Sequence, residues 1–595
     1  MSDPSPAPSS EPAEQASEVQ LDSWKEIAGY VRRDVSTVQR WEKREGMPVH
    51  RHLHDKRGSV YALGSELNAW LESRKDTLPE EETEPAEPPS DEKDETRRKD
   101  PPMWHRLAIA GAALLAVLVA GYFINSWRGE HADKAKITSL AVLPLKNLSS
   151  DPAQEYFAEG MTEALIGQLS GIRDLRVTSR TSVMRFKDTQ LSVPEIAGTL
   201  HVDAIVEGSV IHDGNRIRVH AQLIRTATDE HLWAESYDRE LGDVLALQSD
   251  VALAIAEKVE VSVSGQGRQR LKAVRSTSPE VYENYLKGQF TLGKSNDKAS
   301  VDKSINYFQA AIDKDPGYAP AYLGLAEAYS ELRTIFIGIR PQDVDAKIQS
   351  AAQKALELDP ESVEAHVLLG KIEDLQWQWA DAERQLRRAL EISPNNANAH
   401  AALSDWFLHQ GRTDESLAWA ERGRELDPAS FSGDNIGWIL FCSRRYEEAI
   451  REFRTVLAVR PDDAGALWYL GFALIADNRP EEAIPVLEKA LTASEGSPGI
   501  RGVLVRAYSH AGRRADALRV LGDLKRRKLH SYVPAAAFVN AYLGLDDKEQ
   551  AFAWLDQAYK EHSNILLFVK VHPYFDPLRD DPRFAALVSR MGLSQ

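Results

Sequence analysis

Residues 107–127, LAIAGAALLAVLVAGYFINSW, form an uncharged and mostly apolar run that has no counterpart elsewhere in this polar chain. A helix of that length spans roughly 30 Å, the hydrocarbon thickness of a bilayer. Because the run begins after residue 100, it is not a cleaved secretory signal. We therefore predict a transmembrane helix at 104–127, with Trp104 and Trp127 as interfacial anchors. A buried core helix of a soluble domain is the alternative.

The charges that flank this run predict its orientation. Only Arg128 adjoins its C-terminal side, whereas four basic residues crowd its N-terminal side: Arg97, Arg98, Lys99 and Arg106. Positive charge stays in the cytoplasm, so we expect the N-terminus inside and the long C-terminal region outside. In a bacterium this describes a single-pass protein of the inner membrane with a periplasmic C-terminal region. The reversed orientation is the alternative.

Composition distinguishes the remaining segments. Residues 1–20 are rich in Ser, Pro, Ala and Glu, and residues 76–103 are acidic and Pro-rich, so we expect a disordered segment and a flexible linker. The net charge of −18 argues against nucleic-acid binding by the chain as a whole, yet residues 21–75 carry eleven Lys/Arg against eight Asp/Glu. Cys442 is the only cysteine, which excludes an intramolecular disulfide and a cysteine-rich zinc site.

Residues 23–46 carry the pattern of two short helices joined by a turn. Ser23 is placed to cap the first helix, with Glu26 three residues on, and Ser36 to cap the second. Val38 and Trp41 then face inward, and five polar or basic residues face outward or lie at the helix start: Thr37, Gln39, Arg40, Lys43 and Arg44. Such a helix suits the major groove, where Gln pairs with adenine, Arg pairs with guanine and basic residues contact phosphates.

The next residues extend this pattern. Residues 47–63 predict two short strands around a basic turn, and a third helix capped by Ser65 follows. The segments IAGYV, STVQRWEKREG and RGSVYAL-SELNAWL resemble the MerR/excisionase-like winged helix-turn-helix family, although Arg32-Arg33-Asp34 stands where the family often has a small residue in the turn. The resemblance implies that residues 21–75 bind double-stranded DNA; a protein-binding helical domain is the alternative. The candidate DNA-contacting residues are Ser36, Thr37, Gln39, Arg40, Lys43, Arg44, His52, Lys56, Arg57 and Ser59.

Residues 137–265 predict an α/β domain. One predicted helix presents Phe157, Met161, Leu165 and Leu169 on one face, and a Gly-containing turn at 213–215 joins two strands of a hairpin. The segments AVLPLKNLS, EYFAEGMTEALIGQLS, DAIVEGSV and HLWAESYDREL resemble the TolB-N-terminal-like (FlgO-like) domain. The carboxylates near the helix start are expected to stabilise its N-terminus rather than to act in acid chemistry; they are Asp151, Glu155, Glu159 and Glu163.

Residues 278–595 repeat. Proline follows a polar residue at positions 316, 360, 394, 428 and 461, and the last three gaps are 34, 34 and 33 residues, the period of the tetratricopeptide repeat. The first gap is 44 residues, which predicts an extra loop near 333–343. The repeats imply an all-α superhelix whose groove binds a protein or peptide, with the C-terminal residues as a cap; a spacer or an oligomerisation surface is the alternative. Five tryptophans are expected to pack rather than to anchor a ligand: Trp377, Trp379, Trp406, Trp438 and Trp468.

No familiar catalytic motif accompanies these domains. The sequence lacks a P-loop, GxSxG, HExxH or kinase signature, so we expect no enzyme, no catalytic residues and no cofactor. His50, His52 and His54 alternate along one strand without a carboxylate at metal-ligand spacing, which favours phosphate contact or surface exposure over a metal site.

The predicted architecture is therefore a small winged helix-turn-helix, one transmembrane helix, an α/β sheet domain and an all-α tetratricopeptide superhelix. In plan it resembles membrane-bound transcription regulators of the ToxR/CadC type. We expect DNA binding on one side of the membrane and partner binding on the other, with homodimers formed because one helix-turn-helix reads a single half-site. The alternative function is a membrane-anchored scaffold that assembles envelope proteins.

Overall fold

The computed structural model of this chain divides into two compact units, Met1–Gly111 and Ala112–Gln595. It describes residues 20–21, 23–51, 60–72, 136–172, 174–259, 277–294, 297–335, 341–428 and 433–593. The predicted linker (76–103) and membrane span (104–127) lie outside these ranges, as does the predicted disordered segment (1–20) except for Gln20, which begins a strand. Within these ranges, no helix combines the length and the apolar composition that crossing a membrane requires.

The first unit combines three helices with a three-stranded antiparallel sheet in the order β1-β3-β2. Its elements are β1 (Gln20–Leu21), α1 (Trp24–Tyr30), α2 (Val35–Glu45), β2 (His50–Arg51), β3 (Val60–Leu63) and α3 (Gly64–Glu72). Ile27, Val38 and Leu67 are fully buried where the three helices meet, and the rings of Trp41 and Trp70 lie 5.6 Å apart beside them. The apolar positions expected to face inward therefore form this core.

The helix starts in this unit differ from two of the predicted caps. Asp34, not Ser36, caps α2, because its carboxylate accepts the backbone N–H of Thr37 at 2.9 Å. Helix α3 begins at Gly64, so Ser65 lies inside its first turn rather than at the cap. The predicted cap at Ser23 is present, since its side chain accepts the N–H of Glu26 at 3.3 Å. Arg32 adopts a left-handed φ of 52° in the turn between α1 and α2.

The second unit begins with a six-stranded mixed sheet in the order β6-β4-β7-β8-β9, in which β5 also pairs with β7. Strand β4 runs parallel to β6 and β7, whereas β7, β8 and β9 are antiparallel. Gly214, at φ 56°, forms the tight turn between β7 and β8, as the sequence predicts. The strands are β4 (Ser139–Val142), β5 (Lys146–Asn147), β6 (Arg176–Val177), β7 (Ala204–Asp213), β8 (Arg216–Arg225) and β9 (Glu230–Glu240).

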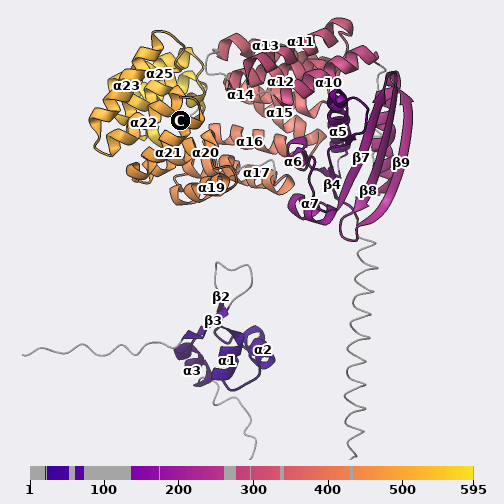
Figure 1. Cartoon of the computed structure of the whole chain (residues 1–595). Coiled ribbons are helices and arrows are strands. Elements are labelled where there is room, and N and C mark those ends of the chain that lie inside the picture. Colours follow the sequence, from indigo (N-terminus) through magenta and orange to yellow (C-terminus); the bar gives the residue numbers. More distant parts are fainter. Residues whose placement is uncertain are drawn as a thin grey trace, which may run out of the picture. The chain divides into compact units, whose positions relative to one another are not determined.

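Helices cover one face of this sheet (Figure 1). They are α5 (Glu155–Ser170), α6 (Arg180–Met184), α7 (Val193–Leu200) and α8 (Val244–Lys258), with short 3-10 turns η1 (Pro152–Gln154) and η2 (Leu241–Asp243). The expected apolar face of α5 is buried, including Phe157 and Met161. Strand β8 alternates buried residues such as Val219 with exposed ones such as Arg218, so the other face of the sheet meets solvent.

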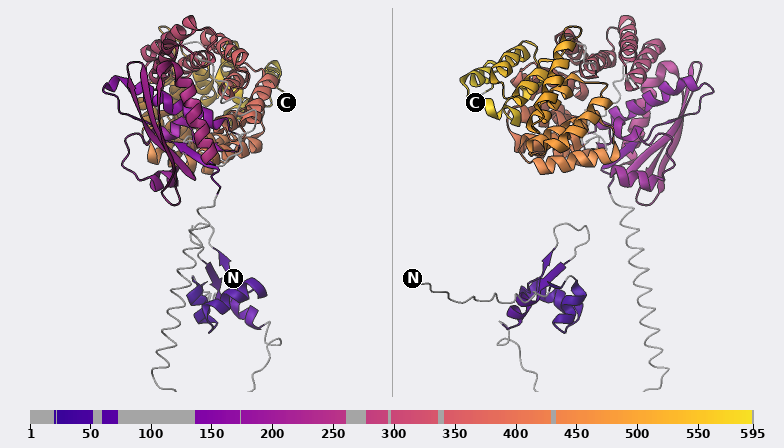
Figure 2. Two further views of the ribbon diagram at one scale, coloured as in Figure 1. Left: turned by 90° about the vertical axis from the view of Figure 1, so that its right-hand side faces the viewer. Right: turned by 60° about the vertical axis from the view of Figure 1, so that its left-hand side comes forward.

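Eight helix pairs follow among the described residues, and Figure 2 (right) shows their C-terminal end opposite the sheet. The pairs are α10–α11 (Pro279–Gly293, Lys298–Lys314), α12–α13 (Ala319–Ile335, Pro341–Leu358), α14–α15 (Val363–Leu375, Trp379–Ile392), α16–α17 (Ala397–His409, Thr413–Leu426), α18–α19 (Gly433–Cys442, Tyr446–Val459), α20–α21 (Ala464–Ala476, Pro480–Ala493), α22–α23 (Pro498–His510, Arg514–Lys528) and α24–α25 (Ala535–Gly544, Lys548–Lys560). Helices α12 and α13 extend into the two ends of the loop expected near 333–343, and residues 336–340 between them lie outside the described residues.

Small residues let the two helices of a pair approach closely. A Cβ atom on Gly437 would lie 2.6 Å from the ring of Phe453, and one on Gly471 would lie 2.4 Å from the side chain of Leu487. Both neighbours are fully buried. Gly437 and Gly471 are therefore packing sites between the two helices of a pair.

Candidate nucleic-acid interface and partner surfaces

The outward face of α2 gathers the predicted DNA-contacting residues. Arg40, Lys43 and Arg44 are exposed and Gln39 is half-buried, while Val38 is fully buried on the opposite side. At about 100° per residue, the four polar residues fall on one side of the helix. This face combines a base-reading amide with three cations, a combination that fits a DNA major groove.

The N-terminus of α2 is capped by the side chain of Asp34. The hydroxyls of Ser36 and Thr37 both donate to the carboxylate of Asp34, as does the backbone N–H of Thr37. These hydrogen bonds hold the pKa of Asp34 well below its ordinary value, so the carboxylate stays charged. A negative charge at this helix end disfavours a phosphate there. The geometry thus places Ser36 and Thr37 in the cap, whereas the other four candidates on α2 project outward.

The predicted wing is described only at its base. His52, Lys56, Arg57 and Ser59 lie outside the described residues, while β2 and β3 on either side pair antiparallel with Arg51 opposite Val60. Nε2 of His50 lies 2.6 Å from Oε2 of Glu66. Across the described part of the chain, no three His, Cys, Asp or Glu side chains are grouped to hold a metal ion.

The C-terminal segment folds back over the first-helix face, by which we mean the face of the array formed by the first helix of each pair. This segment comprises η3 (Asn564–Phe568), η4 (Pro573–Leu578) and α26 (Pro582–Arg590). The ring of Phe568 lies 4.9 Å from His409 of α16 and 5.3 Å from Trp438 of α18. The ring of Tyr574 lies 5.1 Å from Phe472 of α20 and stacks under the guanidinium of Arg506 of α22 at 3.5 Å.

Polar bonds fix the same segment to distant helices. Arg444 donates to the carboxylate of Asp576 at 2.6 Å, and Arg333, in α12, donates to the side chain of Asn564 at 3.1 Å. The indole N–H of Trp379 donates to the carbonyl of Met591 at 2.8 Å. The sequence predicted a cap on the end of the array. The segment instead covers the first-helix face from α16 to α24 and is bonded to α12 through Arg333.

This covering changes the expected partner groove. Leu566, Val569, Phe575 and Leu578 of the segment are fully buried, so in the C-terminal half of the array the chain itself occupies the surface on which a peptide was expected. The tryptophans pack as predicted; the ring of Trp377, for example, stacks on His562 at 4.3 Å. Cys442 is likewise a buried core residue, and burial raises the pKa of its thiol.

Buried charges connect α5 and α6 with the first helix pairs. Glu159 is 4% exposed and contacts Lys187 at 2.8 Å and Arg180 at 3.1 Å. Glu163 lies 3.5 Å from Arg180, and burial raises the pKa of Glu163. Burial also raises the pKa of Glu327, in α12, to about 8, and the charge of Glu163 adds to this rise. Glu155 lies in the first turn of α5 as expected. It also pairs with Lys187 at 2.6 Å, so it belongs to the same ion-pair network as Glu159 and Glu163.

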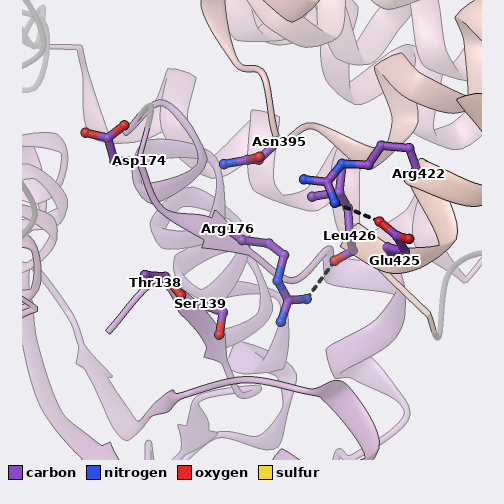
Figure 3. Close-up of a pocket in the computed structure, with 8 residues that line it drawn as sticks. All are labelled: Thr138, Ser139, Asp174, Arg176, Asn395, Arg422, Glu425 and Leu426. Carbon is purple, nitrogen blue, oxygen red and sulfur yellow. Dashed lines mark hydrogen bonds and ion pairs between the residues drawn. The ribbon is translucent and has the colours of Figure 1, made fainter. Parts of the chain in front are cut away.

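A polar pocket of about 350 Å³ lies where the sheet meets the array (Figure 3). Arg176 of β6 donates to the carbonyl of Leu426 at 2.8 Å, and Arg422 pairs with Glu425 at 2.8 Å. Beside it, the buried carboxylate of Asp427 accepts the hydroxyl of Ser182 at 2.5 Å. Both guanidinium groups thus have protein partners, and the pocket is part of a hydrogen-bonded interface between the α/β domain and the helix array.

Two kinds of known domain match this chain. Residues 135–253 match the HilA/YgeH-like transcriptional regulator, second domain, in the region where the sequence predicts a TolB-N-terminal-like domain. Residues 376–431, 435–498 and 474–536 match tetratricopeptide repeats. The chain contains a HilA-like regulator domain and tetratricopeptide repeats. The repeat matches extend to residue 536, beyond the last proline of the 34-residue period.

Individual relatives cover only parts of this chain. It is 32% identical over 232 residues to the putative adenylate cyclase 3 of Rhizobium meliloti, and the aligned segment covers 39% of each chain. It is 24% identical over 321 residues to the transcriptional regulator HilA of Salmonella typhimurium, covering 53% of this chain and 55% of that protein. Among solved structures, YrrB, a TPR protein with an unusual peptide-binding site, shares 21% identity over 31% of this chain and 91% of its own, with a TM-score of 0.22.

The first of these relatives corrects the prediction that the chain is not an enzyme. A protein with the name of an enzyme, a putative adenylate cyclase, aligns with 39% of this chain. The prediction relied on the absence of short catalytic signatures, and such signatures cover only the chemistries whose spacing is familiar. The same chain also matches the tetratricopeptide repeat and HilA-like families.

Sequence reasoning missed three groups that shape these surfaces. Asp34 stands three residues before Thr37, a capping pattern as good as the one ascribed to Ser36. Asp427 was used only as a mark of the repeat, although its carboxylate joins the array to the α/β domain. The return of residues 563–593 across the array left no local signal, because its contacts join residues more than a hundred positions apart, such as Arg444 and Asp576.

Proposed function

We propose that this protein is a membrane-anchored bacterial transcription regulator that binds DNA through residues 21–75 and a protein partner through its C-terminal region. The observation that carries the proposal is the HilA-like regulator domain at 135–253, which occurs in one chain with a helix whose outer face bears Gln39 and three cations. The HilA-like domain suggests transcription regulation, and the tetratricopeptide repeats suggest protein–protein interaction.

DNA binding is assigned to the outward face of α2 and to the wing. On α2 the contacts would come from Gln39, Arg40, Lys43 and Arg44, and from the wing they would come from His52, Lys56, Arg57 and Ser59. The resemblance of residues 21–75 to MerR/excisionase-like winged helices supports this assignment. A dimer would bring two such helices to two half-sites.

Anchoring is assigned to the apolar run at 104–127, with the N-terminus in the cytoplasm. Residues 137–265, with their resemblance to TolB-N-terminal-like domains, and the repeats would then lie outside the inner membrane. Because the chain's own C-terminal segment covers the first-helix face from α16 to α24, we assign partner binding to the surfaces that this segment leaves open.

Arg40→Ala with Lys43→Ala tests the DNA-binding assignment in a fragment of residues 1–80, whose described part has its own core. Both side chains are exposed, so the fragment should stay folded while its affinity for promoter DNA falls. If each cation neutralises one phosphate, the slope of log affinity against log salt should drop by about 2. Gel shifts at several salt concentrations measure both effects.

Lys25→Ala is the matched control, because Lys25 is an exposed cation on α1 rather than α2. It should leave the salt slope nearly unchanged. Equal affinity and equal slopes for all three proteins would contradict the assignment.

The alternative function is a membrane-anchored scaffold in which the repeats assemble envelope proteins. Reporter fusions at residue 80 and at the C-terminus separate the two functions. The regulator requires a cytoplasmic reporter to be active at residue 80, whereas an inactive one there would leave the scaffold as the better proposal.

A further inference from the structure

Helix α23 carries a concentration of positive charge that the rest of the chain lacks. Residues 513–528 hold seven Lys/Arg and two Asp/Glu, in a chain whose net charge is −18. The two carboxylates, Asp516 and Asp523, pair with Arg513, Arg519 and Arg526. Four cations make no ion pair with any described carboxylate, and all four are exposed: Arg514, Lys525, Arg527 and Lys528. Three of them contact other groups, since Lys525 and Lys528 lie over the rings of Tyr542 and Trp554 and Arg527 donates to the carbonyl of Gly496.

Apolar side chains lie between these cations. Leu518 is 49% exposed and Leu529 is 77% exposed, although most leucines of the array are buried. The inward residues of α23, such as Val520 and Leu524, pack on the array. At about 100° per residue, Leu518 and Leu529 lie close together on the solvent side of α23. Arg514 and Lys525 flank them on one side and Arg519 and Arg526 on the other, whereas Arg527 and Lys528 lie outside this face. Helix α23 lies at the end of the array away from the sheet (Figure 1).

We propose that this outer face of α23 docks onto an anionic lipid bilayer, with its cations on the phosphates and Leu518 and Leu529 in the interface. Basic residues on both sides of an apolar strip are the pattern of helices that lie in a membrane surface. A nucleic-acid surface would use the cations but would gain nothing from the exposed leucines, and α23 carries no aromatic side chain on which a base could stack. The contact is separate from the predicted span at 104–127 and does not depend on it.

A fluorescent label at residue 518 tests the proposal in the full chain. Leu518→Cys introduces an exposed thiol, and the native Cys442 is 1% exposed, so an environment-sensitive dye should react selectively at residue 518. The protein is reconstituted with vesicles of phosphatidylcholine alone or with phosphatidylglycerol at a ratio of 7:3. We expect a blue shift of the emission and protection from an aqueous quencher only in the anionic vesicles. Attachment through residues 104–127 would occur in both kinds of vesicle, so it does not produce this difference.

Matched variants separate docking from general charge effects. The same label at Val459→Cys, an exposed apolar position at the end of α19, should show no shift. Arg514→Glu with Lys525→Glu should weaken docking by at least about 30-fold, since each cation at an anionic surface contributes about fivefold. Lys303→Glu with Lys347→Glu changes the net charge equally on exposed residues of α11 and α13 and should leave docking unchanged.

Three results would overturn the proposal. One is the same emission in neutral and anionic vesicles, and another is an equal effect of the two charge reversals. The third is a shift on adding duplex DNA to the detergent-solubilised protein without a shift in vesicles, which would assign the face to nucleic acid. Failure of DNA binding by the fragment of residues 1–80 would leave this proposal standing, because that fragment lacks α23.

Discussion

At the scale of single residues, the carboxylates with a raised pKa are the most informative groups. Glu327 faces the charge of Glu163 from α5, the amide of Gln289 from α10, and more distantly Glu364 of α14 and Arg180 of α6. Burial and the neighbouring negative charges raise its pKa from the ordinary 4.5 to about 8. The folded protein therefore holds a proton on Glu327 at neutral pH, whereas the unfolded chain releases it.

This proton makes the stability of the array depend on pH. Between pH 4.5 and about 8 the unfolded state binds fewer protons than the folded state, so the free energy of unfolding should fall as the pH rises through this window. Glu327→Gln has no proton to lose; it should match the native protein near pH 4.5 and be more stable than it near pH 8. Denaturant unfolding at pH 4.5, 6 and 8 measures the difference.

Glu391→Gln is the control, because that carboxylate is exposed on α15. It should shift the stability by similar small amounts at all three pH values. Parallel curves for Glu327→Gln and the native protein would show that Glu327 titrates normally.

At the scale of elements, the C-terminal segment decides how the array is stabilised. Its 3-10 turns are too short to be stable alone and gain their energy from packing on the first-helix face. Phe575, at the centre of η4, is fully buried and lies 5.7 Å from the ring of Phe584 in α26. The segment acts as part of the core rather than as an appendage.

Phe575→Ala should therefore lower the free energy of unfolding by about 3–5 kcal/mol, as for other buried aromatic residues. Because Trp438 contacts the same segment, the quenching of tryptophan fluorescence by acrylamide should rise as well. Val459→Ala, which removes an exposed apolar side chain, should change neither quantity. Unaltered quenching with reduced stability would mean that the segment stays docked without Phe575.

Local patterns predicted much of this architecture, and distant contacts account for what was missed. The 34-residue period recurs directly along the sequence, and the apolar face of α5 depends on residues four positions apart; both agree with the structure. The cap of α2 was placed two residues late because Asp34 and Ser36 are both good capping residues. The path of residues 563–593 depends on complementary surfaces far away in the chain, which no local periodicity encodes. The DNA-contacting residues on α2 and the wing stay predictions.

At the scale of the whole second unit, the α/β domain holds two separate parts of the array. Tyr282 and Leu286 of α10 are buried in the core of the α/β domain, and Asp427, just after α17, accepts hydrogen bonds from Ser179 and Ser182 of that domain. The first four helix pairs are thus attached at both ends to one sheet domain. We expect the unit to unfold as one cooperative body.

Asp427→Ala should weaken this coupling. It removes the acceptor of the buried Ser182 hydroxyl and of the half-buried Ser179 N–H, a cost of about 1–3 kcal/mol. The lost contacts join the two domains rather than lying within either one. Calorimetry should then resolve separate transitions for the α/β domain and the array. Asp462→Ala, which alters an exposed carboxylate on the same array, should keep the native single transition. A single transition in both variants would show that α10 alone couples the domains.

The return of the C-terminal segment also has a consequence during synthesis, because the segment is the last part of this array to be made. Residues 563–593 leave the ribosome after every helix that they cover, so the aromatic face built by Trp438, Phe441 and Phe472 is complete before its cover exists. During that interval the nascent chain presents an apolar surface of the kind that chaperones bind. A message or a chain shortened by a few dozen residues would keep this surface permanently open, and quality-control proteases would recognise the product as unfinished.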